Sequence, residues 1–170
     1  MRKLAIIIFT FAFGALSVGY GQSGKADFTG EWQLDKAKSK GLPEGIDQVL
    51  TVAQKGDRLD VKTRVSGGPN GEQTHEDSYS LTGEAADFKP PMISGGGTVK
   101  KAKRTAKWAA EGKGMDATEQ ADIEGPNGPA TIKATRSWRL SEDGKTLTVE
   151  MAIDQPDGDT NKSTRIFTKK

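Results

Sequence analysis

The feature of this chain that most constrains its fold is a two-residue alternation of apolar and polar side chains, repeated from residue 27 almost to the end. Successive side chains of a β-strand point to opposite faces, so this alternation predicts strands with one buried and one exposed face. The clearest run is 145–154, with apolar side chains at Leu147, Val149, Met151 and Ile153. The pattern predicts strands at residues 27–35, 47–54, 58–66, 72–82, 99–110, 113–123, 129–140, 145–154 and 160–168.

Short glycine-containing turns separate these segments and recur in a similar order. Leu59–Leu81 and Met115–Leu140 each contain a strand, a Gly-Pro-Asn-Gly turn and a second strand ending in a similar aromatic motif. Leu147–Phe167 repeats this plan more loosely. Glycine supplies the positive φ angles that tight turns require. Three similar hairpins joined by short connections predict an all-β antiparallel meander of about 8–10 strands.

A meander of this length can form a sandwich or a closed barrel. A sandwich leaves edge strands with unpaired backbone groups, whereas closure removes them, so an up-and-down barrel is the expected architecture. Residues 22–170 are expected to form the barrel as a single domain, because they are too few for two full cores.

One segment fits two structures. Residues 99–107 also fit an amphipathic helix with small apolar residues along one stripe. The match of Trp108 and Gly112 to the hairpin plan favours a strand. The preceding segment, 83–98, is predicted to be a long connection, and loops of that length are usually functional or disordered.

The first residues have the pattern of a secretory signal. Arg2 and Lys3 precede an apolar run at 4–16, and small residues follow it. The run is too short for a permanent membrane-spanning helix. Residues 1–21 are therefore predicted to be a signal peptide cleaved near Gly19–Gly21. The mature protein is expected to be secreted or periplasmic, with no insertion into a membrane.

Charge and cysteine content exclude several classes of protein. The chain has 25 Lys and Arg against 23 Asp and Glu, but two of the basic residues lie in the leader, so the remainder is neutral. Nucleic acid is therefore not an expected partner. The lack of cysteine excludes a disulfide framework, a thiolate zinc site and a Cys nucleophile. One His and scattered carboxylates show no metal-ligand spacing, and no cofactor is predicted.

Two stretches resemble a known family. Asp27–Asp35 resembles the Gly-x-Trp opening of lipocalin-like and other calycin barrels. Trp138–Thr148 resembles the Trp-x-Leu-Ser-x-Asp-Gly-Lys-Thr-Leu-Thr stretch of uncharacterised secreted bacterial lipocalin-like proteins. The resemblance implies a lipocalin-like up-and-down barrel, in which Trp32 plugs the closed end beneath an arginine of the last strand, here Arg165. The central Thr-Asp-Tyr motif of lipocalins is missing.

Alternation also predicts which side chains face the lumen, because inward and outward residues alternate along every barrel strand. Six of the predicted inward positions are Ala, so part of the wall is thin enough to leave a cavity. The ionisable and aromatic residues predicted to face inward are His75, Asp77, Tyr79, Arg104, Trp108, Glu119, Arg136 and Trp138.

Three inward charges are predicted to meet across adjacent strands. If Ala106 and Ala134 both lie opposite Glu119, then Arg104 and Arg136 are its diagonal neighbours, within reach of long side chains. The cluster carries one surplus positive charge, which would recognise a carboxylate or similar anion on a partly apolar ligand. The alternative is a satisfied ion network without a ligand, or a bulge that turns these charges to solvent.

The sequence leaves three functions open. The first is binding of a small hydrophobic or anionic ligand in the lumen, by residues predicted to be Arg104, Glu119, Arg136, His75, Tyr79 and Trp108. The second is a structural or interaction module of the cell envelope with a filled barrel. The third is an enzyme of hydrolase or isomerase type that uses His75 beside Asp77. No catalytic residue is assigned, because no nucleophile is marked in the sequence.

Overall fold

The computed structural model describes residues 24–68, 71–90, 97–125, 128–156 and 158–170. The predicted signal peptide, the middle of the predicted loop 83–98 and parts of the predicted turns lie outside the described residues. The elements run in the order β1 (Gly30–Leu34), β2 (Asp47–Lys55), β3 (Arg58–Ser66), β4 (Gln73–Ser80), β5 (Thr82–Asp87), β6 (Thr98–Trp108), the 3-10 turn η1 (Ala110–Gly112), β7 (Gly114–Gly125), β8 (Gly128–Leu140), β9 (Thr146–Asp154) and β10 (Thr160–Lys169).

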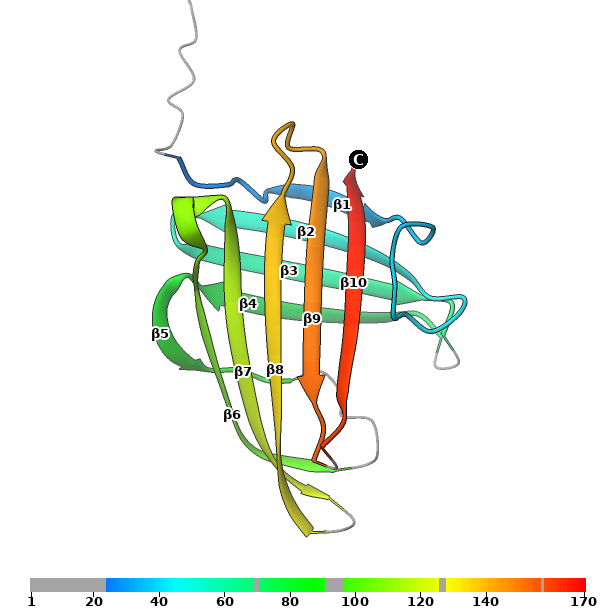
Figure 1. Cartoon of the computed structure of the whole chain (residues 1–170), viewed down its shortest axis with the longest axis vertical. Coiled ribbons are helices and arrows are strands. Elements are labelled where there is room, and N and C mark those ends of the chain that lie inside the picture. Colours follow the sequence, from blue (N-terminus) through cyan, green and yellow to red (C-terminus); the bar gives the residue numbers. More distant parts are fainter. Residues whose placement is uncertain (1–23, 69–70, 91–96, 126–127, 157) are drawn as a thin grey trace, which may run out of the picture.

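The strands form one antiparallel sheet that curls into a nearly closed barrel, as the alternation predicts. Their order in the sheet is β4-β3-β2-β1-β10-β9-β8-β7-β6-β5. In Figure 1, β2–β4 run across one side of the molecule, and β7–β10 cross them steeply on the other side. Strand β1 joins the two sides by pairing with both β2 and β10. Strands β4 and β5 end the order, and no backbone ladder joins them among the described residues. We call this opening the seam.

The nine predicted strands are all present, with boundaries that differ by a few residues. Residues 99–107 belong to strand β6 and not to a helix. The prediction of a continuous loop at 83–98 is wrong at its beginning, because 82–87 form β5. All six residues of β5 are exposed, and its pairing with β6 is interrupted by a bulge. An edge strand without a buried face carries no alternation, which is the physical reason why the pattern missed it.

One end of the barrel is closed by a core of large aromatic and aliphatic side chains. The chain before β1 crosses this end, where the Gln54 side chain accepts a hydrogen bond from the Phe28 amide and donates one to the Ala26 carbonyl. The Trp32 indole in turn donates to the Phe28 carbonyl at 2.9 Å. Phe28 meets the Trp138 ring edge to face, with 5.7 Å between the ring centroids. Phe28 and Trp32 are completely buried, so they plug the barrel.

Two expectations about this end need correction. Trp32 and Trp138 are buried, but Trp108 is only half-buried, and its indole donates to the exposed Asp57 carboxylate. The cation over the Trp32 ring is Lys169, 5.2 Å from the centroid, and not Arg165. Lys169 lies directly opposite Trp32 in the pairing of β1 with β10, which explains why Lys169 and not Arg165 covers the Trp32 ring.

A second, smaller cluster lies toward the other end of β6–β8. It is formed by the buried residues Ala102, Ala121 and Ile123, with Phe88, Ala130 and Ile132 packed against it. Small side chains therefore line this part of the wall, as the predicted run of inward Ala indicates. Within the described part of the chain, no helix is long and apolar enough to cross a membrane.

The plug at the closed end can be tested by truncation. Trp32→Ala is expected to lower the free energy of unfolding by about 3–5 kcal/mol, because it removes a large, fully buried aromatic. Trp108→Ala is expected to cost clearly less, because that side chain is half-buried. Urea denaturation of the two variants measures the difference, and a loss at Trp32 no larger than at Trp108 would contradict the role of Trp32.

Candidate functional site

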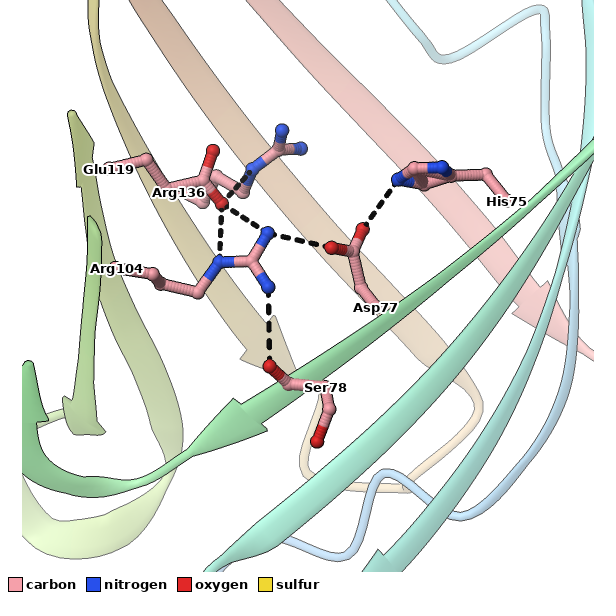
Figure 2. A network of polar contacts seen from close by, with 6 residues as sticks. All are labelled: His75, Asp77, Ser78, Arg104, Glu119 and Arg136. Carbon is pink, nitrogen blue, oxygen red and sulfur yellow. Dashed lines mark hydrogen bonds and ion pairs between the residues drawn. The ribbon is translucent and has the colours of Figure 1, made fainter. Parts of the chain in front are cut away.

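The inward charges gather in a polar layer between the two apolar clusters (Figure 2). Arg104 and Glu119 are only 4% and 5% exposed. The Arg104 Nε donates to Glu119 Oε1 at 2.8 Å, and the Arg136 Nε donates to the same oxygen at 3.1 Å. The predicted contact of Glu119 with both arginines is therefore present.

The register of β6 and β7 differs from the predicted one. Arg104, not Ala106, lies directly opposite Glu119, while Ala134 lies opposite Glu119 as predicted. The hairpin closes one position earlier than expected, with the Ala109 amide bonded to the Gly114 carbonyl. A shift of two residues leaves every side chain on its original face, so the inward set is unchanged.

Arg104 also connects the two sides of the seam. Its Nη2 donates to the Asp77 carboxylate at 2.7 Å, and its Nη1 donates to the Ser78 carbonyl at 3.2 Å, both on β4. The guanidinium lies between two rings, 4.1 Å from the Tyr79 centroid and 4.2 Å from the Phe88 centroid. A side chain of β6 thus supplies the cross-link that no backbone ladder supplies between β4 and β5.

The environment shifts the pKa values of the layer. Burial raises the pKa of the Tyr79 phenol to about 12, so this group stays neutral at physiological pH. Burial alone would lower the pKa of Arg104 and Arg136. Electrostatic interactions with Tyr79, Glu119 and Asp77 outweigh this effect and raise both pKa values above their usual range. Both guanidinium groups therefore stay charged.

A further ionisable group, Arg165, joins the layer and was not predicted there. Its Nη1 donates to the Gln48 side chain at 3.2 Å, and no carboxylate forms an ion pair with it among the described residues. Burial, together with repulsion from Arg136, lowers the Arg165 pKa to about 10, which still leaves it charged at neutral pH. Arg165 alternates with the buried Phe167 on β10, and this alternation was a signal that it faces inward.

His75 is half-buried beside Asp77, as predicted. Its Nε2 lies 3.0 Å from the carboxylate, close enough for an ion pair when the imidazole is protonated, but without the alignment of a hydrogen bond. No hydroxyl group is hydrogen-bonded to His75 in the part of the chain that the structure describes. No group of three potential metal-ligating side chains occurs there either.

The remaining predicted site residues separate into two places. Tyr79 belongs to the polar layer, where its ring lies against Arg104. Trp108 stacks on Phe28 at the closed end, 6.3 Å between centroids, with Lys25 over its ring. Trp108 therefore lies apart from the charged residues with which it was grouped.

A solved structure shares this architecture. Zebrafish ileal bile acid-binding protein, complexed with cholic acid, superposes with a TM-score of 0.52 and 18% identity, over 84% of this chain and 98% of that one. The chain folds as a calycin-type β-barrel. A fatty-acid-binding protein of Manduca sexta matches at a TM-score of 0.43 and 14% identity, over 84% of this chain and 99% of that one. No protein-family model and no curated protein matches the sequence of this β-barrel.

The dependence of the layer on Glu119 gives a stability prediction. Glu119→Ala is expected to lower the free energy of unfolding by about 3–5 kcal/mol, because it leaves the buried Arg104 and the half-buried Arg136 without their shared carboxylate. Glu119→Gln should cost less, since its amide oxygen still accepts hydrogen bonds. Asp116→Ala, which removes an exposed carboxylate on the outer face of the same strand, should cost no more than about 1 kcal/mol. Equal losses for Glu119→Ala and Asp116→Ala in urea denaturation would show that Glu119 is not a buried partner.

The Tyr79 phenol predicts a dependence on alkaline pH. Its folded-state pKa lies above the usual value of 10, so the associated stability is fully present below pH 10 and is lost as the pH rises toward 12. The phenolate absorbance of the folded protein, minus that of Tyr79→Phe, should therefore develop near pH 12. A midpoint near pH 10 would mean that the phenol is solvated.

Proposed function

We propose that the barrel binds a small, partly apolar ligand with an anionic group in its lumen. The observation that carries this proposal is the unbalanced charge of the polar layer. Among the described residues, the guanidinium groups of Arg104 and Arg136 form ion pairs with two carboxylates, those of Asp77 and Glu119. The guanidinium of Arg165 forms an ion pair with neither carboxylate and adds one positive charge. A buried cation without a counter-charge is costly. An anionic ligand would supply the missing charge.

The apolar surroundings support a ligand with a hydrophobic body. The layer lies between the aromatic core and the Ala-rich cluster, so a bound molecule could contact apolar side chains on either side of its charged group. The zebrafish protein of the same fold is complexed with cholic acid. This likeness in fold supports a small hydrophobic ligand, and the charge of the lumen supports the anionic group.

The location proposed for this activity is outside the cytoplasm. Arg2 and Lys3, followed by an apolar run and small residues, support export and cleavage near Gly19–Gly21. A secreted or periplasmic barrel would then carry or sequester its ligand there.

A structural module with a filled barrel remains the second candidate, and one observation favours it. Arg104, Glu119 and Asp77 satisfy one another without any ligand, as an ion network does in a purely structural role. Only the surplus charge at Arg165 distinguishes the two functions.

Native mass spectrometry of the purified full chain separates these candidates. The proposed function predicts a barrel that carries one small molecule, which is released on denaturation and found to be anionic. It also predicts that N-phenylnaphthylamine, a neutral apolar fluorophore, binds once the natural molecule is removed. A mass equal to that of the protein alone, together with no binding of the fluorophore, would favour the filled barrel.

A further inference from the structure

Three polar groups on one wall of the barrel are buried without a hydrogen-bond partner. They are the Nε of Arg165, the indole Nε1 of Trp138 and the hydroxyl of Ser163. The indole and guanidinium nitrogens can only donate hydrogen bonds, and the hydroxyl can donate one as well. Buried polar groups are rarely left unpaired, because each loses its hydration without compensation. A group of such atoms therefore points to a missing acceptor.

The pairing of the strands brings these groups together with Arg136. Trp138 on β8 and Arg165 on β10 occupy the same row of the sheet, separated by one residue of β9. Arg136 and Ser163 occupy the adjacent row, again separated by one residue of β9. Neighbouring strands lie about 4.8 Å apart, so long side chains from β8 and β10 can reach a common point.

Arg136 adds a second positive charge and terminal donors that have no hydrogen-bond partner among the described residues. Its Nε is bonded to Glu119, while its terminal nitrogens point away from the other side chains of the network in Figure 2. Arg104 differs, because its nitrogens are occupied by Glu119, Asp77 and Ser78, and aromatic rings cover both of its faces. The capacity to bind a further anion therefore lies with Arg136 and Arg165.

We propose that Arg136, Trp138, Ser163 and Arg165 form a subsite for the oxyanion head group of the ligand. The subsite presents hydrogen-bond donors and two positive charges, which suits a carboxylate, sulfonate or phosphate with several acceptor oxygens. This assignment rests on the proposed function and identifies the residues that select the ligand. Arg104 is then a positioning residue, which acts on the subsite through Glu119 and its bond to Arg136.

Two fluorophores that differ only in an anion test this assignment. Anilinonaphthalene sulfonate carries a sulfonate that N-phenylnaphthylamine lacks. The full chain should bind the sulfonate probe at least about tenfold more tightly, equivalent to about 1.4 kcal/mol. Arg165→Gln should abolish this preference and leave the affinity for the neutral probe within about twofold. Arg165→Lys should restore part of it, because the charge returns without the planar fork.

Smaller changes in the same wall refine the test. Trp138→Phe removes the indole N–H but keeps an aromatic ring, and Ser163→Ala removes the hydroxyl. Each should weaken the sulfonate probe severalfold without affecting the neutral one. Arg64→Gln, at an exposed arginine on the outer face of β3, is the matched control and should change neither affinity.

The thermal stability of the ligand-free protein gives a second readout. Arg165→Gln removes a half-buried charge with which no carboxylate of the described residues pairs, so its Tm should equal or exceed that of the original protein. A lower Tm, together with equal loss of both probes, would make Arg165 a structural residue and overturn the subsite. An intact preference for the sulfonate probe in Arg165→Gln would also overturn it. Failure of the original protein to bind either probe would overturn the proposed function instead.

Competitors that share a similar alkyl tail but differ in their head group identify the anion that the subsite prefers. Decanoate, decyl phosphate and decanol compete with the sulfonate probe, and the subsite predicts that both anions displace it at concentrations at least about tenfold below decanol. The anion that displaces the probe at the lower concentration identifies the preferred head group. Equal displacement by all three would show that the tail alone binds, which would also overturn the subsite.

Discussion

The buried ion pair between Arg104 and Glu119 is the interaction on which both the polar layer and the integrity of the barrel depend. From β6, Arg104 reaches Glu119 on β7 and, across the seam, Asp77 on β4. It therefore forms ion pairs with the buried Glu119 and the half-buried Asp77, and it links two strands, β4 and β6, that have no backbone ladder between them. Glu119 in turn accepts a hydrogen bond from Arg136, so the Arg104–Glu119 pair also positions a side chain of β8. Removing one partner of such a network leaves charges away from water with nothing to compensate them.

The layer combines a satisfied part with an unsatisfied part. On the side of β4, β6 and β7, Arg104, Asp77 and Glu119 are all ion-paired, and rings cover the Arg104 guanidinium. On the side of β8 and β10, two guanidinium groups and unpartnered donors lie together, and no carboxylate of the described residues pairs with Arg165. A purely structural barrel gains nothing from that surplus, since a neutral side chain at Arg165 would remove a desolvation penalty. Local destabilisation of this kind is typical of binding sites, because side chains that suit a ligand are often not the ones that would make the protein most stable.

The predictable parts of the structure are those that depend on local patterns. Nine strands, the antiparallel meander and the inward face of Arg104, Glu119 and Arg136 follow from alternation and turn chemistry. Strand β5 was missed because every one of its residues is exposed. The register at Glu119 was off by two positions because it depends on where the hairpin closes, which the residue pattern leaves open. Arg165 was overlooked in the lumen because the resemblance assigned it to cover Trp32, a position that Lys169 occupies.

The sequence by itself determined the periodicity, and with it the fold class, the faces of the strands and the presence of buried charges. A period of two residues is a local property of the chain, so each strand records it independently of its neighbours. Only the tertiary structure decided which charges meet across the seam, because partners such as Arg104 and Asp77 lie on strands that have no backbone ladder between them. The same holds for Arg165 and Gln48, which are 117 residues apart. Whether a buried cation has a counter-charge depends on the closure of the whole barrel, and no local pattern contains that information.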